Sequence, residues 1–318
     1  MRKRISLATL FACVLGVMAL VLAGCGGASQ STEPQASTEA TEQTEATDQG
    51  TSAAGSYKLV TDGTLTCVSE LGFAPFEYLE AGSTEPVGYD IDVANEIAKR
   101  LGLECKFLPS QDFDSLVPTI KEGGKADIAI AGITISDDRA KEIDFSEPYF
   151  ESNLALIVKG DSTQTVSSLD AEGVKVACQT GTTGDAWIEE NLPKAEKVPL
   201  TDISAGLAGV STGSYQAYVV DLPVARKNLK DAFTDLTILE EIPTGEQYGI
   251  AISKDNPELT KAIDAALAEM EADGTIQKIW NKWMVETATV DDAAAAETTA
   301  EATTAEATTA DAADATAK

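Results

Sequence analysis

The stretch that decides the fold is ADIAIAGITISDDRAKEIDFSEPYF, residues 126–150. Its apolar start, residues 126–131, has the composition of a buried strand. Ser136 is placed to cap a short helix, and Arg139 falls in the first turn of that helix. A cation there needs an anion, and a planar guanidinium suits a carboxylate held by two hydrogen bonds. The stretch therefore predicts a strand that delivers Arg139 to an anion-binding turn, with local pairing to one of the two preceding aspartates as the alternative.

Strands and helices alternate on both sides of this stretch, which predicts an α/β fold with parallel sheets. About 230 residues show this alternation, close to the size at which one core gives way to two. The first set has expected strands at 65–69, 104–108 and 127–131 and expected helices at 92–101 and 115–122. The second set has expected strands at 154–158, 174–178, 217–220 and 236–239 and expected helices at 184–191, 203–209 and 224–230. Two closing helices, 258–272 and 275–284, are expected to bury Trp280 and Trp283 in the core.

The two ends of the chain differ from its middle. Residues 1–24 have a basic head and an apolar run, which is typical of a secretion signal, although the run approaches the length of a membrane span. Leu-Ala-Gly-Cys, ending at Cys25, resembles a bacterial lipobox, so we expect cleavage and lipidation of Cys25 rather than a retained helix. Residues 25–56 are polar and are expected to be a disordered tether. Residues 287–318 are expected to be a disordered, acidic, Ala/Thr-rich tail.

Composition excludes several classes of function. The net charge is −29, of which the signal contributes +3, the tether −5 and the tail −6, leaving −21 for residues 57–286. Such a field disfavours nucleic acid and anionic lipid as partners. Histidine is absent, which excludes Ser-His-Asp and Cys-His catalysis and histidine metal ligands. Cys67, Cys105 and Cys178 are expected to be buried thiols, with a Cys67–Cys105 disulfide left open.

Ordered motifs along the chain resemble the family 3 extracellular solute-binding proteins, the amino-acid receptors of ABC importers. The resemblance covers about residues 57–286. One of its motifs is AGITISDDRAKEIDFSEPYF (131–150), within the stretch quoted above. The other motifs are GTLTCVSELGFAPFEY (63–78), VGYDIDVANEIAKRLGL (87–103), FDSLVPTIKEGGKADIAIAG (113–132), VKVACQTGTTGD (174–185), AYVVDLP (217–223) and EQYGIAISKDNPEL (246–259). One motif would be weak, whereas the ordered set is specific.

The resemblance implies a two-lobed, periplasmic-binding-protein-like fold of type II. Two α/β domains are joined by crossovers near residues 149–153 and 244–248, with the ligand in the cleft between them. Lobe 1 is expected to be discontinuous, comprising residues 57–150 and 247–286. Lobe 2 is expected at residues 151–246.

The resemblance also implies how an amino acid is held. Arg139, with the backbone N–H groups of Thr134 and Thr183, takes the carboxylate. Asp221 takes the ammonium with the Thr134 hydroxyl and the Gly132 carbonyl. Without the resemblance, Asp221 is as well explained as the N-cap of a helix.

Three further positions match the walls of the family's site. Phe73 and Phe113 match aromatic residues that clamp the ligand, and alone they would be ordinary core residues. Glu70 matches a position that contacts the ligand side chain, and otherwise it is an exposed turn residue. Gln179 and Val220 depart from glutamine receptors, so a polar or cationic amino acid is favoured.

The sequence thus predicts a monomeric receptor that binds a free amino acid by cleft closure and delivers it to the permease of an ABC importer. It is expected outside the cytoplasm, attached to the membrane only by its N-terminal lipid, with no cofactor, metal or nucleic acid. One alternative is an enzyme on the same scaffold that resembles cyclohexadienyl dehydratase, with Glu70 as general acid. A surface sensor is the other.

Overall fold

The computed structural model describes residues 57–285. The expected signal peptide, lipidated Cys25, tether and acidic tail therefore lie outside the described residues.

A first five-stranded sheet has the order β5-β1-β6-β13-β7. Strand β1 (Thr64–Val68) pairs in parallel with β5 (Glu104–Phe107) and with β6 (Ile128–Ala129). Strand β13 (Ala251–Ile252) pairs antiparallel with β6 and with β7 (Asp144–Phe145). The predicted parallel pairing is confirmed for β1, β5 and β6. The pairs that β13 forms with β6 and β7 are antiparallel.

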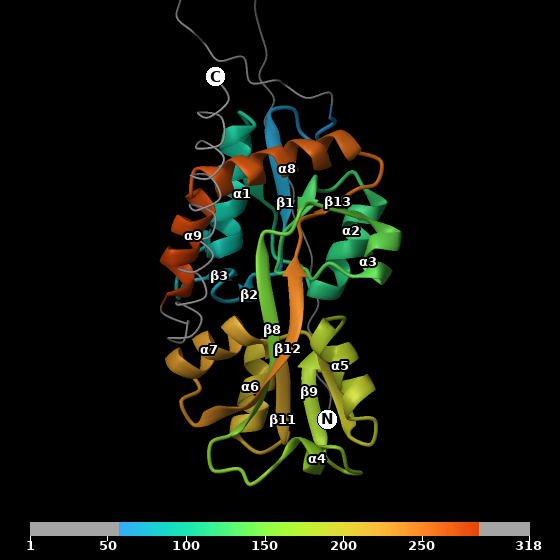
Figure 1. Cartoon of the computed structure of the whole chain (residues 1–318), viewed down its shortest axis with the longest axis vertical. Helices are drawn as coiled ribbons and strands as arrows, with labels where there is room; N and C mark the ends of the chain where they lie inside the picture. The colour runs from blue at the N-terminus through green and yellow to red at the C-terminus, as the bar shows by residue number, and fades with distance from the viewer. Residues whose placement is uncertain (1–56, 286–318) are drawn as a thin grey trace, which may run out of the picture. The chain divides into compact units, whose positions relative to one another are not determined.

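Helices cover both faces of this sheet, because alternate side chains of β1 are buried on opposite sides. Leu65 and Cys67 belong to the core that includes Ile97, whereas Val68 belongs to a second core with Leu116. Figure 1 shows α1 and α9 on one side and α2 and α3 on the other. The helices are α1 (Tyr89–Arg100), α2 (Leu116–Glu122) after the 3₁₀ turn η1 (Phe113–Ser115), α3 (Asp137–Glu142), α8 (Pro257–Ala272) and α9 (Thr275–Met284).

A second five-stranded sheet has the order β10-β9-β11-β8-β12. Strand β9 (Lys175–Gln179) pairs in parallel with β10 (Glu196–Leu200) and β11 (Ala217–Asp221), and β8 (Phe150–Lys159) pairs antiparallel with β11 and with β12 (Leu236–Tyr248). Its helices are α4 (Val166–Leu169), α5 (Thr183–Asn191), α6 (Ile203–Ser211) and α7 (Leu222–Asp231). A small antiparallel sheet joins β2 (Gly72–Phe73), β3 (Glu77–Leu79) and β4 (Pro86–Val87).

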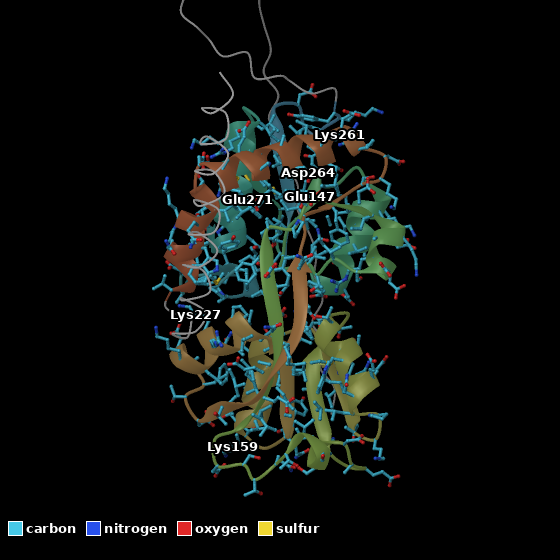
Figure 2. All side chains as sticks on the ribbon, in the orientation of Figure 1. Glu147, Lys159, Lys227, Lys261, Asp264 and Glu271 are labelled. Carbon is cyan, nitrogen blue, oxygen red and sulfur yellow. The ribbon has the colours of Figure 1, made fainter. Side chains whose placement is uncertain are left out.

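Strands β8 and β12 carry the chain from the first sheet to the second and back, and they run side by side (Figure 1). At one end of the pair Tyr248 lies opposite Phe150, and the Tyr149 N–H donates to the Tyr248 carbonyl at 3.0 Å. Close to this end, the Glu147 N–H donates to Asp264 of α8 at 2.8 Å (Figure 2). The two connecting segments are therefore held to each other and to the first sheet.

The structure differs from the sequence expectation at several points. Strands β8 and β12 are longer than expected because they stay paired with each other from the second sheet towards the first, as far as Phe150 and Tyr248. The short strands of the small sheet were missed. Trp280 and Trp283 are half-buried rather than core residues, and the Trp283 indole N–H donates to Asp92 at 2.7 Å. Cys67 and Cys105 are free thiols whose sulfur atoms lie 3.7 Å apart, and Cys178 is a buried free thiol.

Candidate functional site

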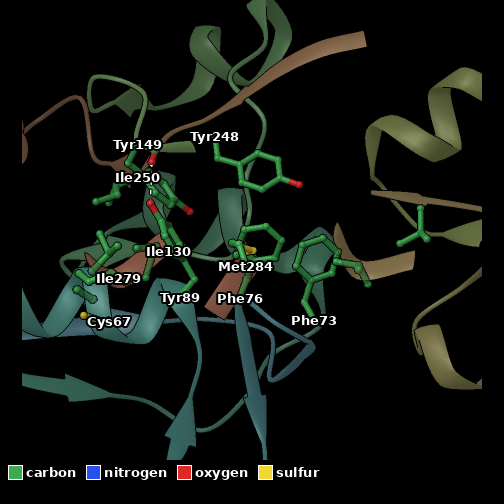
Figure 3. Packing of buried hydrophobic residues seen from close by; sticks show 14 of the residues in the cluster. Cys67, Phe73, Phe76, Tyr89, Ile130, Tyr149, Tyr248, Ile250, Ile279 and Met284 are labelled. Atoms are coloured by element: carbon green, nitrogen blue, oxygen red, sulfur yellow. Dashed lines mark hydrogen bonds between the residues drawn. The ribbon is translucent and has the colours of Figure 1, made fainter. Parts of the chain in front are cut away.

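An aromatic cluster lies where the two connecting strands meet the first sheet. Figure 3 shows Phe73, Phe76, Tyr89, Tyr149 and Tyr248 gathered there. The Phe76 ring centroid is 5.3 Å from that of Tyr248, in an edge-on arrangement that is favourable for aromatic pairs. The Tyr89 hydroxyl donates to the Tyr149 carbonyl at 3.1 Å, so the cluster is tied by hydrogen bonds as well as by packing.

Gly132 follows β6 and lies directly against this cluster. Its φ of +53° is in the left-handed region, which favours glycine. A Cβ atom here would lie 2.7 Å from Phe73 Cε1 and 3.3 Å from Tyr248 Cε2. The position therefore requires glycine both for its backbone and for the close approach of Phe73, so these two residues lie together.

A pair of buried carboxyl groups lies behind Gly132. Asp90 Oδ2 accepts hydrogen bonds from the Gly132 N–H and the Tyr149 hydroxyl, each at 2.8 Å. Glu77 is fully buried beside Asp90, and no other residue donates to either Glu77 oxygen. Burial, followed by the proximity of Asp90, holds the pKa of Glu77 well above its usual value, and burial raises the pKa of Asp90 to about 6. The two groups can lie side by side when Glu77 stays protonated and its O–H donates a hydrogen bond to Asp90.

Arg139 lies at the start of α3, as predicted, and the Ser136 side chain caps this helix by accepting from the Arg139 N–H. Its guanidinium donates to the Thr134 carbonyl at 2.7 Å and to the Gly181 carbonyl at 3.0 Å. The guanidinium carbon also lies 5.3 Å from the centre of the Phe113 ring, a cation–π contact. Since a guanidinium has five N–H donors, three remain for other partners.

The alternative of local pairing for Arg139 is wrong. Asp138 pairs with Lys141 at 2.6 Å. The groups that act on Arg139 are distant in sequence: burial lowers its pKa, while Glu246 and Asp221 oppose that shift. The negative charges of Glu246 and Asp221 therefore stabilise the guanidinium.

Glu246, near the end of β12, was missed by sequence reasoning. One of its oxygens, Oε2, accepts from the Thr134 hydroxyl and from the Thr183 hydroxyl, each at 3.0 Å. Only 9% of Glu246 is exposed. The available signal was its place in the motif EQYGIAIS, but a glutamate among exposed residues of one strand does not reveal that it turns inward.

Asp221 ends β11, where its side chain accepts from the Tyr248 hydroxyl. It stands at the N-cap position of α7 but makes no side-chain cap, so the alternative role as an N-cap does not account for it. Burial, and then the nearby Glu246, raise the pKa of Asp221 to about 7, and the Tyr248 hydroxyl and Arg139 oppose the shift. An ammonium group would supply the missing counter-charge.

Glu70 follows β1 and is half-buried rather than an exposed turn residue. Burial raises its pKa to about 7, Gln179 opposes the shift, and Asp202 and Asp112 add to it. Carboxyl groups thus gather around Glu70 without a neighbouring cation among the groups that act on it.

The structure brings most of the predicted site residues into one connected group. Arg139 touches Phe113 and Thr134, Thr134 and Thr183 share Glu246, and Tyr248 joins Gly132 and Phe73 to Asp221. Glu70 is separate, being related to this group only through charge. Within residues 57–285, no helix has the length and apolar character of a membrane span.

The chain is similar to proteins of one known family. The model of the family "Bacterial extracellular solute-binding proteins, family 3" matches residues 65–286. Among curated proteins, the chain is 33% identical over 216 residues to ABC transporter arginine-binding protein 1 of Escherichia coli (strain K12), covering 66% of this chain and 86% of that protein. It is 32% identical over 206 residues to ABC transporter glutamine-binding protein GlnH of Bacillus subtilis (strain 168), covering 64% and 75%.

Solved structures agree in fold. An ancestral arginine-binding protein bound to arginine matches with a TM-score of 0.65 and 37% identity, covering 70% of this chain and 98% of that one. The ancestral amino acid-binding protein AncCDT-1, a precursor of cyclohexadienyl dehydratase, matches with a TM-score of 0.65 and 33% identity, covering 70% and 95%. These similar proteins are two-lobed α/β proteins. This chain likewise combines two five-stranded sheets with α-helices.

Proposed function

Because the chain belongs to the bacterial extracellular solute-binding proteins, family 3, we propose that it is a receptor that binds a free amino acid and delivers it to an ABC importer. The observation that carries this function is that Arg139 and Asp221 are held beside the same segment: Arg139 donates to the Thr134 carbonyl, and Tyr248, which forms a bridge with Thr134, donates to the buried Asp221. An α-amino acid brings one negative and one positive group a few ångströms apart. A site of this kind replaces the hydration that both groups lose on burial.

The site residues keep the roles proposed for them. Arg139 binds the carboxylate with its remaining N–H donors, helped by the backbone N–H groups of Thr134 and Thr183. Asp221 accepts from the ammonium, together with the Thr134 hydroxyl and the Gly132 carbonyl. Phe73 and Phe113 enclose the aliphatic part of the ligand. Support for these roles comes from the close contacts among the residues themselves.

Charge favours a cationic amino acid. The carboxyl groups of Asp221 and Glu70 are both placed near a site with one guanidinium, Arg139. A ligand with a cationic side chain offsets this excess, and Glu70, with Gln179 beside it, is the natural partner for that side chain. Arginine is the first candidate because its planar guanidinium matches a carboxylate and an amide oxygen.

Closure couples the two sheets. We assign residues 57–150 and 247–286 to lobe 1 and residues 151–246 to lobe 2, so that Arg139 and Asp221 come from different lobes. One ligand touches both only when the lobes are close together, and binding therefore shifts the population towards closure. The importer's permease then recognises the closed receptor.

The chain acts outside the cytoplasm, as members of its family do. We further propose that the signal peptide 1–24 is removed, that lipidated Cys25 anchors the chain, and that it works as a monomer. Globomycin treatment of cells tests the anchor. It should leave the uncleaved precursor, whereas normal processing would contradict lipidation at Cys25.

An enzyme is the second candidate, favoured by two observations. One similar structure is described as a precursor of cyclohexadienyl dehydratase, and the pKa of Glu70 near 7 suits a general acid. Incubation with prephenate and arogenate, monitored for ring aromatisation, separates the candidates. The curated relatives reported above are binding proteins, and we propose that this chain is not an enzyme.

The deciding experiment is a thermal-shift screen of the lipid-free chain against the proteinogenic amino acids, ornithine, citrulline and cystine, followed by calorimetry. Binding stabilises the folded state in proportion to the logarithm of ligand concentration over Kd. We expect arginine or another cationic amino acid to give the largest shift, with a Kd of about 1 µM or lower, equivalent to about −8 kcal/mol. The absence of any shift would contradict the receptor function, and a largest shift with glutamate would contradict the charge preference.

A further inference from the structure

Glu246 lies on the buried face of β12, which it shares with Ile242 and Tyr248. The register of β12 against β8 shifts between Ile242 and Glu246, so that four steps along β12 match two steps along β8. Because two residues are added, the alternation of faces continues through this irregularity. Gly245, with φ of +62°, lies within it and donates its N–H to the Asn153 side chain at 3.0 Å. Gly245 and Gln247 are exposed, whereas Glu246 between them is buried.

The buried carboxylate connects two segments that carry the amino-acid site. Thr134 follows the first sheet's β6, and Thr183 opens α5 next to the second sheet. Both hydroxyls donate to the same oxygen of Glu246, each at 3.0 Å. A hydrogen bond to a carboxylate is about twice as strong as one between neutral groups, so the shared oxygen fixes the spacing of the two threonines.

The groups of the described residues that act on Glu246 are Thr183, Thr134 and Thr244, which donate to it, and Arg139, which attracts it. Asp221 and Glu246 repel each other, and the Asp221 side chain accepts from the Tyr248 hydroxyl. Glu246 is not needed to cap a helix or to complete the pairing of β12 with β8, which runs through the backbone.

We propose that Glu246 is a positioning residue for ligand binding: by joining the Thr134 and Thr183 hydroxyls, it holds the two halves of the amino-acid site at the spacing that a ligand needs. This role rests on the proposed receptor function. It acts through the threonines and does not read the ligand side chain. Loss of Glu246 therefore weakens every amino-acid ligand by the same factor, because the ligand itself must then order the two segments.

The test measures Kd by calorimetry for L-arginine, L-citrulline and L-glutamine on the wild-type chain, Glu246→Leu and Glu246→Gln. Glu246→Leu should weaken all ligands that bind the wild type by about tenfold or more, with their order unchanged. Glu246→Gln keeps an oxygen acceptor of the same shape and should restore affinity to within about threefold of wild type. Glu240→Leu, which alters an exposed glutamate of the same strand, is the matched control and should bind as wild type.

Three results would overturn the positioning role: wild-type affinity in Glu246→Leu, a changed order of ligands, or a Glu246→Gln variant as weak as Glu246→Leu. If Glu246→Leu does not fold, Thr183→Val removes one of the two hydrogen bonds and keeps the backbone N–H. It should weaken the three ligands equally, and unchanged affinity contradicts the role. A wild-type chain that binds none of the probes refutes the receptor function itself, which is a different result from loss or retention in the variants.

Discussion

Arg139 is a cation in the first turn of helix α3, and its surroundings explain how it is stabilised there. The helix dipole disfavours it there, and burial disfavours its charge. Two backbone carbonyls, the Phe113 ring and the negative charges of two carboxylates compensate. Residues held at such a cost commonly serve binding.

Replacement of Arg139 by alanine should abolish amino-acid binding, with Kd rising by about a hundredfold or more, because the ligand carboxylate loses its charged partner. Calorimetry measures the loss, and circular dichroism should still show a cooperative thermal transition. Arg226→Ala is the control. Arg226, on α7, pairs with Glu241 at 2.9 Å, and its replacement should leave affinity unchanged. Normal affinity in Arg139→Ala would refute the assigned role.

Glu77 should make stability depend on pH. Its pKa is raised in the folded chain, so it keeps a proton that the unfolded chain releases near pH 4.5. The stability it contributes is fully present below that pH and is lost as pH rises towards the folded pKa, by about 1.4 kcal/mol per pH unit. Glu77→Gln cannot lose a proton, so its free energy of unfolding should gain on wild type from pH 5 to pH 7. Urea titrations at each pH measure this difference, and a constant difference would contradict a protonated Glu77.

At the scale of elements, the turn between β6 and α3 is the part that joins fold and site. Asp90 of α1 holds the Gly132 N–H, Tyr248 of β12 forms an antiparallel bridge with Thr134, and the Ile135 N–H donates to the Gln247 carbonyl at 2.8 Å. Two elements, α1 and β12, thus fix one short segment. The positions of Gly132 and Thr134 follow from this bracing.

Gly132→Ala should weaken binding by about tenfold or more and destabilise the fold by about 2–4 kcal/mol, because a Cβ both strains the backbone and displaces Phe73. Gly274→Ala separates the two causes. Gly274 is in the left-handed region with φ of +73°, and nothing lies within 4 Å of a Cβ built there, so this variant should lose only about 1–2 kcal/mol and bind normally. Equal effects of the two substitutions in calorimetry and urea unfolding would show that contact with Phe73 does not matter.

At the scale of the whole molecule, acidic groups dominate. The Asp221 and Glu70 carboxyls both have a pKa raised to about 7, chiefly by burial. Each is therefore partly protonated at pH 7. A ligand that carries two cations favours the ionised form of both, and protons leave when it binds.

Binding of arginine at pH 7 should release about one proton, and its affinity should rise between pH 6 and pH 8. Calorimetry in phosphate and in Tris buffer measures the release, because the two buffers differ in ionisation enthalpy. Glu70→Gln should reduce the release by about half, since each group carries about half a proton at its pKa. Proton uptake on binding would contradict this account.

Local features could be predicted from the order of the amino acids alone. Alternating apolar runs predicted the α/β class, Ser136 and Arg139 marked the capped turn, and the ordered motifs indicated the family. These features depend on residues close together in the chain, where periodicity and capping act. The regular helices and the parallel strands followed from them, with boundaries that differ by a few residues.

Only the tertiary structure decided which groups meet. Thr134 and Glu246 are 112 residues apart, and Thr183 and Glu246 are 63 apart, yet they share one hydrogen-bonded oxygen. Glu77 is an ordinary glutamate in the sequence and a neutral acid in the fold, because its pKa depends on burial beside Asp90. Burial and electrostatics are properties of neighbours in space, and long-range strand pairing chooses those neighbours.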